Sequence, residues 1–419
     1  MKDYESAVTE LFSRHPSVQT DGFASGAYKP GLGGMEALDR ALGQPWKEWR
    51  SVHVAGTNGK GSVSCFIASA LHAAGLKVGL YTSPHLVDFR ERMLIPGEGT
   101  ISREEVLEFL ETHAADIEGL SFFEITTGMA FDWFRRRGVD IAVIETGLGG
   151  RLDSTNVITP DVSVITSIGL DHCALLGDTR AAIAAEKAGI IKPGVSAVIW
   201  GRDAETDDIF IRKAAQCGSR LVFADETAPE CPDAAEIAET FDLKGPCQQT
   251  NVRTAMAALD VLGVRPQGLE KAAATCHLRG RWERLLEQPE TICDIGHNPP
   301  ALKVNFTRLK ELAAQGRRLT IVYGIMADKD LDGIAPLMPS DADYILAAPH
   351  TERSLAVKAL HRRLSQLRPD LRVSSSPSVA EAVQTALEEA SGDPRSLVYI
   401  GGSTFVVSEA VQFIENHRL

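Results

Sequence analysis

Several features that would assign this 419-residue sequence to a special class of protein are missing. No apolar run approaches the roughly 18 residues of a membrane-spanning helix, and the start, Met1-Lys2-Asp3-Tyr4-Glu5, is too polar for a signal peptide. Lys and Arg number 43 against 56 Asp and Glu, so the net charge of −13 disfavours binding to nucleic acid or anionic lipid. The seven cysteines include no Cys-x-x-Cys pair, which argues against a disulfide framework and a cysteine zinc site. We therefore expect a cytoplasmic protein with neither a nucleic-acid nor a membrane partner.

The composition that is present is typical of a globular protein of two or three domains, with 44% hydrophobic and 24% charged residues. From residue 51, buried apolar runs alternate with helical patterns, which predicts an α/β domain with a mostly parallel sheet. Strands are expected at 51–55, 77–81, 139–145, 162–168 and 195–200, with helices near 103–113, 126–137, 179–188 and 250–262.

A second alternation of strands and helices begins after residue 285. Its strands are expected at 291–295, 319–323, 344–348, 371–374 and 397–400. The sequence therefore predicts two α/β domains, at 1–280 and 285–419, joined by a linker near 278–285.

A glycine-rich segment, GTNGKGS at 56–62, lies between a predicted strand and an amphipathic helix. Its glycines allow several backbone N–H groups to point at one anion, Lys60 adds a positive charge, and the helix presents its positive amino end. The segment departs from the common phosphate-loop pattern because Gly61 separates Lys60 from the hydroxyl of Ser62. A turn that binds nothing is the alternative, but this context predicts a nucleoside triphosphate site.

Three further side chains could serve triphosphate chemistry, which needs a divalent ion held by hard oxygen ligands. Glu145 closes the predicted strand 139–145, at the strand end where ligands collect in parallel sheets. A strand-end glutamate that merely faces solvent is the less favoured alternative for Glu145. His172 would more often be structural, and Lys187 in a predicted helix would more often be solvated.

The motifs taken together resemble the Mur ligase superfamily, in its folylpolyglutamate/dihydrofolate synthase branch. The resemblance rests on GTNGKGS at 56–62, YTSPHL at 81–86, ETGLGGRLDSTN at 145–156, GLDH at 169–172, EKAGI at 186–190, RGR at 279–281 and DIGHNP at 294–299. It implies a P-loop NTPase-like N-terminal domain with a mostly parallel sheet and a smaller Rossmann-like α/β C-terminal domain. Two segments depart from the usual pattern of the family. Ile295-Gly296 replaces Gly-Ala or Val-Ala, and Gly402-Ser403-Thr404-Phe405 replaces Gly-Ser-Phe-His, so the histidine of the family is absent there.

The resemblance also implies roles for individual residues. ATP contacts fall on Thr57, Asn58, Gly59, Lys60, Gly61, Ser62, Asn251, Arg281 and Asp294. Mg²⁺ ligands fall on Ser83, Glu145 and His172, and a carbamylated Lys187 would hold a second Mg²⁺. His297 would lie near the phosphates and act with Lys60 and Lys187 in catalysis. The acceptor substrate would contact Lys29, Gly31, Leu32, Ser121, Phe123, Leu152, Asp153 and Ser154.

These residue types suit the implied chemistry. A flat heteroaromatic ring stacks on Phe123, and Asp153 can accept hydrogen bonds from ring N–H groups, although Phe122 and Phe123 would otherwise be taken as core residues. Arg281 lies between the predicted domains, where a guanidinium could stabilise the transferring phosphoryl group once the domains close. A surface arginine on a linker is the alternative.

The resulting prediction is an ATP-dependent amide ligase that joins L-glutamate to dihydropteroate, to folates, or to both, through an acyl phosphate. The resemblance leaves room for a monovalent cation and implies a monomer. Two other functions stay open: a cell-wall precursor ligase of the same superfamily, and a P-loop module that binds nucleotide without forming a bond. The first would need a nucleotide-sugar domain, and the second leaves Arg281 and Asp294 unexplained.

Overall fold

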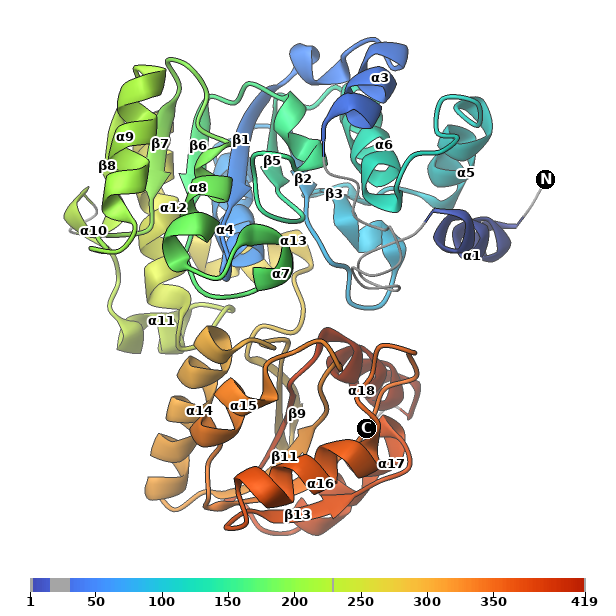
Figure 1. Ribbon diagram of the computed structural model, residues 1–419, viewed down its shortest axis with the longest axis vertical. Coiled ribbons are helices and arrows are strands. Elements are labelled where there is room, and N and C mark those ends of the chain that lie inside the picture. The colour runs from blue at the N-terminus through green and yellow to red at the C-terminus, as the bar shows by residue number, and fades with distance from the viewer. Residues whose placement is uncertain (1–2, 16–30, 228–229, 418–419) are drawn as a thin grey trace. The chain divides into compact units, whose positions relative to one another are not determined.

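The computed structural model describes residues 3–15, 31–227 and 230–417, and the chain divides into two compact units (Figure 1). Unit 1 consists of Met1–Asp242 and Cys247–Leu278, and unit 2 consists of Leu243–Pro246 and Arg279–Leu419. Within the described ranges, no helix combines the length and the apolar character needed to cross a bilayer. The predicted α/β class is confirmed in both units.

Unit 1 is built on an eight-stranded sheet with the order β4-β3-β2-β5-β1-β6-β7-β8. The six strands from β2 to β8 in this order are parallel, whereas β3 and β4 are antiparallel additions at one edge. The strands are β1 (Arg50–Ala55), β2 (Val78–Tyr81), β3 (Met93–Ile95), β4 (Gly99–Thr100), β5 (Ile141–Glu145), β6 (Val162–Ile165), β7 (Ser196–Ile199) and β8 (Leu221–Phe223). Because β1 lies between β5 and β6, the carboxyl ends of segments distant in sequence meet at one sheet edge.

Helices cover both faces of this sheet (Figure 1). The helices are α1 (Tyr4–Arg14), α3 (Gly33–Ala41), α4 (Lys60–Ala73), α5 (Arg103–Thr112), α6 (Phe122–Arg137), α7 (Cys173–Leu176), α8 (Arg180–Ala188), α9 (Asp207–Cys217), α10 (Ala224–Thr227), α11 (Ala234–Thr240), α12 (Gln248–Leu262) and α13 (Ala272–Cys276). Residues 61–71 of α4 are all buried, since α4 packs on β1, β2 and β5 and also against α12 and α13.

Several element boundaries differ from the sequence prediction, and two of them have an identifiable cause. Helix α6 begins at Phe122 rather than near 126, because Ser121 and Glu124 form a reciprocal capping box that the pattern of apolar residues does not reveal. Strand β6 ends at Ile165 rather than at 168. The residues that follow β6 turn away because Thr166 and Ser167 donate hydrogen bonds to the carbonyl oxygen of Asn58.

Unit 2 is built on a six-stranded sheet with the order β13-β12-β11-β14-β10-β9. All neighbours are parallel except β9, which pairs antiparallel with β10 and falls partly in the range expected to be a linker. Its strands are β9 (Glu283–Glu287), β10 (Glu290–Asp294), β11 (Arg318–Tyr323), β12 (Ala342–Leu346), β13 (Arg372–Ser375) and β14 (Ser396–Gly401). Its helices are α14 (Pro299–Ala314), α15 (Leu331–Ile334), α16 (Val357–Leu367), α17 (Val379–Ala390) and α18 (Thr404–His417).

Candidate active site

The predicted phosphate loop joins the end of β1 to the start of α4. Gly59, at φ 85°, is the N-terminal cap of α4, and no side chain caps this helix end. A Cβ atom on Gly59 would lie 2.3 Å from Asn251 Oδ1, and one on Gly56 would lie 1.7 Å from Thr166 Oγ1. Only glycine fits at these two positions, and the amide groups at the start of α4 are left for an anion.

The segment after β6 holds the loop in place. Thr57 donates its backbone N–H to Ser167 O (2.7 Å) and its hydroxyl to Gly169 O (3.1 Å). The Thr57 hydroxyl in turn accepts the N–H of Gly169 at 3.0 Å. These bonds fix the loop before any ligand binds, which is the preorganisation that phosphoryl transfer requires.

Two lysines converge on the carbonyl groups of this loop. Lys60 Nζ donates to Gly56 O (3.1 Å) and Thr57 O (3.3 Å), and Lys187 Nζ donates to Gly56 O at 2.8 Å. Lys187 is only 3% exposed, so the alternative of a solvated helix lysine is wrong. Burial, assisted by the positive charge of Lys60, lowers the pKa of Lys187 to about 7. Near neutral pH, Lys187 is therefore neutral part of the time.

The predicted metal ligands lie at or after the carboxyl ends of three strands, β2, β5 and β6. Glu145 ends β5 and is 3% exposed, so it does not face solvent, and its Oε2 accepts the backbone N–H of Ser83 at 3.1 Å. His172 follows β6 at φ 53°, and its Nε2 lies 3.7 Å from Asp171 Oδ2. The structure thus brings Ser83 and Glu145 together. Across residues 3–15, 31–227 and 230–417, no three His, Cys, Asp or Glu side chains gather as a metal site by themselves.

The predicted acceptor residues gather around the turn that follows Glu145. The Phe123 ring packs so closely on Gly147 that a Cβ there would lie 2.5 Å from its Cζ, and Asp153 Oδ2 accepts the N–H of Leu148 at 2.7 Å. Burial raises the pKa of Asp153. Leu152 and Ser154 flank Asp153 and are partly exposed.

The other predicted acceptor residues lie in two places. Ser121 is 6% exposed, and its hydroxyl is engaged in the cap of α6. Gly31 and Leu32 directly precede α3, with Leu32 as its N-terminal cap. Lys29 lies outside the described residues.

The predicted residues of unit 2 surround the end of β10. Asp294 Oδ2 accepts the N–H of Trp282 (2.9 Å), and Oδ1 accepts Gly296 N–H (2.8 Å) and Asn305 Nδ2 (2.7 Å). Burial raises the pKa of Asp294. The Asp294 carboxylate therefore fixes both its own turn and the residue that follows Arg281.

Arg281 and His297 make local contacts in unit 2. Arg281 Nη1 lies 3.4 Å from Arg279 O and 3.3 Å from Gly280 O. His297 Nδ1 is 3.0 Å from Ile295 O, and because a carbonyl oxygen only accepts, Nδ1 carries the proton and Nε2 is the basic nitrogen of the neutral ring.

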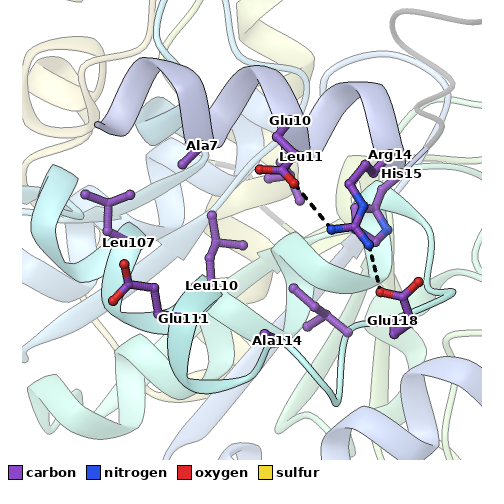
Figure 2. Close-up of a pocket in the computed structure, with 11 residues that line it drawn as sticks. Ala7, Glu10, Leu11, Arg14, His15, Leu107, Leu110, Glu111, Ala114 and Glu118 are labelled. Carbon is purple, nitrogen blue, oxygen red and sulfur yellow. Dashed lines mark hydrogen bonds and ion pairs between the residues drawn. The ribbon is translucent and has the colours of Figure 1, made fainter. Parts of the chain in front are cut away.

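A groove of about 330 Å³ lies between α1 and α5 (Figure 2). Its floor is apolar, with Leu11, Leu107 and Leu110, and Arg14 at its rim contacts Glu10 and Glu118. None of the predicted site residues lines this groove.

Comparison with known proteins decides which family this arrangement represents. The Mur ligase middle domain matches residues 54–253, and the Mur ligase glutamate ligase domain matches residues 280–404. The chain is 35% identical over 411 residues to the folylpolyglutamate synthase of Lacticaseibacillus casei, covering 90% of this chain and 92% of that one. It is 34% identical over 376 residues to the dihydrofolate synthase/folylpolyglutamate synthase of Escherichia coli K12, covering 87% and 86%.

The chain belongs to the folylpolyglutamate synthase/dihydrofolate synthase family of Mur ligases. A structure of Escherichia coli FolC in complex with DHPP and ADP is similar over 100% of this chain and 99% of that one, with a TM-score of 0.83 at 29% identity. The bifunctional enzyme of Yersinia pestis, complexed with AMPPNP and Mn ion, gives a TM-score of 0.82 at 26% identity, covering 100% and 99%. The family read from the motifs is thus confirmed, while the roles of single residues stay predictions.

One buried residue of this family member escaped the sequence analysis. Gln248, 1% exposed, donates from Nε2 to Ser62 Oγ at 3.4 Å, and its Oε1 accepts Asn251 Nδ2 at 2.9 Å. It therefore links two predicted ATP contacts. Gln248 and Asn251 are three residues apart on one face of α12. Two polar residues at this spacing in an otherwise apolar helix are the feature of the sequence that could have identified Gln248.

Proposed function

We propose that this protein is an ATP-dependent ligase that joins L-glutamate to dihydropteroate and to the glutamate tail of reduced folates. A carboxylate oxygen of the acceptor bonds to the γ-phosphorus of ATP as the bond to the β,γ-bridging oxygen breaks and ADP leaves. The amino group of glutamate then bonds to the acyl carbon, inorganic phosphate leaves, and the nitrogen loses its proton. The enzyme contributes mainly position and charge neutralisation.

The observation that carries this proposal is the convergence of Lys60 and Lys187 on Gly56, beside strand ends that bear Ser83 and Glu145. The loop amides and Lys60 would bind the β- and γ-phosphates. Gln248 would hold Ser62 and Asn251 in place from α12. All these groups belong to unit 1.

The donor set near Glu145 fits a hard divalent cation. The Glu145 carboxylate, the hydroxyl of Ser83 and phosphate oxygens are the hard oxygen ligands that Mg²⁺ prefers, and Mg²⁺ retains waters in sites of this kind. His172 would add an imidazole nitrogen to this set. When bound, Mg²⁺ would neutralise charge on the phosphates. The proposal leaves room for a monovalent cation beside these ligands.

A carbamylated Lys187 belongs to the same proposal. Carbamylation adds CO₂ to a neutral amine, and the lowered pKa of Lys187 supplies that neutral form near pH 7. The product is an anion with two oxygens, which could hold a second Mg²⁺ and would be attracted rather than repelled by Lys60.

Unit 2 supplies the remaining proposed contacts with ATP. Asp294 and Arg281 would contact the nucleotide, while the basic Nε2 of His297 would lie near the phosphates. The acceptor ring would stack on Phe123, with Asp153 accepting its N–H groups. We propose that the enzyme works as a monomer.

The decisive experiment supplies dihydropteroate and tetrahydrofolate separately, each with ATP, MgCl₂ and L-glutamate. Release of ADP should depend on both acceptor and glutamate, and mass spectrometry should show one added glutamyl group per turnover. Product with only one acceptor would restrict the enzyme to that single activity. Amide formation from a UDP-muramyl substrate alone, or ATP turnover that neither acceptor nor glutamate stimulates, would refute the proposal.

A further inference from the structure

A histidine is buried in the strand that leads to the phosphate loop. His53 is the fourth residue of β1, is 0% exposed, and lies between Val52 and Val54. Its Nε2 is 2.8 Å from Thr155 Oγ1, while its Nδ1 has no hydrogen-bond partner in the described part of the chain. Burying an imidazole with one unpaired nitrogen is costly, so the Nε2 contact calls for an explanation.

The direction of each hydrogen bond in this contact follows from the next residue. Thr155 donates both its hydroxyl (2.5 Å) and its backbone N–H (3.1 Å) to Asp153 Oδ1. The threonine hydroxyl has a single proton, which goes to the carboxylate, so its oxygen accepts from His53 Nε2–H. Burial lowers the pKa of His53 to about 3, so the ring is neutral near pH 7. The contact with Thr155 Oγ1 places the single ring proton on Nε2.

The two oxygens of the Asp153 carboxylate accept hydrogen bonds from different partners. Oδ1 is committed to Thr155, and Oδ2 accepts the N–H of Leu148 at 2.7 Å. An ionised carboxylate oxygen has two acceptor positions, and both positions of Oδ1 are taken by Thr155, so a ligand N–H would be accepted at Oδ2. The backbone N–H of Gly147 also interacts with this carboxylate. A bond received at Thr155 Oγ1 strengthens the bond that this hydroxyl gives and fixes its rotamer.

We infer that His53 is a positioning residue for the acceptor substrate, acting through Thr155 to hold Asp153 with Oδ2 toward the ring N–H groups of a flat heteroaromatic acid. The inference deepens the proposed function and rests on it. His53 lies three residues before Gly56. The strand β1 therefore carries the residue that supports Asp153 and also leads into the phosphate loop. A shift of β1 would therefore displace both substrates together.

The test compares matched pairs of variants. His53→Gln keeps an N–H donor at the same number of bonds from the backbone, whereas His53→Met removes it at similar volume. Thr155→Ser keeps the hydroxyl, whereas Thr155→Val removes it. We expect His53→Met and Thr155→Val to raise the KM for the acceptor about tenfold, with the KM for ATP changing by less than about twofold. His53→Gln and Thr155→Ser should recover most of the loss.

A double-variant cycle separates positioning from general damage to the core. If His53 acts through Asp153, His53→Met should raise the acceptor KM much less in an Asp153→Asn background than in the wild type. Equal effects in both backgrounds, or equal rises in the KM for acceptor and ATP, would overturn the inference. Should His53→Met fail to fold, the cycle of Thr155→Val with Asp153→Asn still tests the link between Thr155 and Asp153 through which His53 would act. Additive effects in that cycle would overturn the inference.

The wild-type enzyme distinguishes the two levels of the argument. If it forms no amide from either acceptor, the proposed function fails, whatever the variants do. If it does form the amide and the cycle is additive, the function stands and only the role of His53 is refuted.

Discussion

Lys187 Nζ lies 2.8 Å from the carbonyl oxygen of Gly56, a residue 131 positions earlier in the chain. The contact joins α8 to the first residue of the phosphate loop and places a buried amine beside Lys60. Burial, together with the positive charge of Lys60, lowers the pKa of Lys187 to about 7. This lowered pKa has two consequences that can be measured separately, one for stability and one for chemical modification.

The first consequence is that Lys187 lowers the free energy of unfolding by an amount that depends on pH. The unfolded lysine keeps its proton up to a pKa of 10.5, whereas the folded one loses it at about 7, so the unfolded state binds more protons between these values. The contribution of Lys187 to the free energy of unfolding therefore rises with pH across this window. Lys187→Met should stabilise the protein most below pH 7, by on the order of a few kcal/mol, and progressively less toward pH 10.5.

Urea unfolding in bicarbonate-free buffer at several pH values measures this difference. Lys310→Met, at an exposed lysine on α14, is the matched control for the removal of a lysine. If the increase in the free energy of unfolding caused by Lys187→Met is constant with pH, or grows as pH rises, the lowered pKa of Lys187 is contradicted.

The second consequence is reaction of Lys187 with CO₂. With ¹³C-bicarbonate at about pH 8, where the amine is mostly neutral, we expect a carbamate carbon signal in the ¹³C NMR spectrum of the wild type. Lys187→Met should lack this signal, and Lys310→Met should keep it. A signal that persists in Lys187→Met would place the modification elsewhere.

Gly59→Ala should impair ATP binding through a steric effect on Asn251. The new Cβ would lie 2.3 Å from Asn251 Oδ1, in addition to the strain of φ 85°. Gly75 is the matched control, because its φ of 87° is similar but nothing lies within 4 Å of its Cβ position. Both variants should lose about 1 kcal/mol of stability from the backbone strain, but only Gly59→Ala should raise the KM for ATP, by about tenfold or more. Steady-state kinetics and thermal unfolding separate the two effects.

Glu145→Gln should weaken the requirement for a divalent cation in a specific way. Glutamine keeps the acceptor for Ser83 N–H but removes the negative charge, so the fold should persist while the Mg²⁺ concentration for half-maximal activity rises at least about tenfold. Titration of activity with MgCl₂ at saturating ATP measures this. An unchanged Mg²⁺ dependence would show that Glu145 is not a ligand.

The parts of the fold and site that follow local rules could be predicted from the sequence. The phosphate loop is defined by consecutive residues, and Glu145 closes an apolar run whose strand character is clear. The start of α6 was misplaced because its signal is a capping pair, Ser121 and Glu124, rather than a pattern of apolar residues. The end of β6 depends on hydrogen bonds to Asn58, a residue more than 100 positions earlier.

Residues that act through tertiary contacts could not be predicted in the same way. Gln248 is 186 positions from Ser62, and His53 is 102 positions from Thr155. In the sequence, each is merely a polar residue in a buried element, and its partner becomes apparent only when helices and strands are packed. The burial of Lys187 likewise depends on where α8 lies and not on the composition of α8.

The packing of α4 sets a limit on how the protein can be divided. Ser69 Oγ donates to Gly268 O at 2.6 Å and Cys276 Sγ lies 3.5 Å from Cys65 O, so the segment after residue 247 covers the helix of the phosphate loop. A fragment ending at Asp242 would expose apolar residues of α4 to water and should aggregate on expression. Any attempt to excise the nucleotide-binding half by truncation must therefore retain the chain through Leu278.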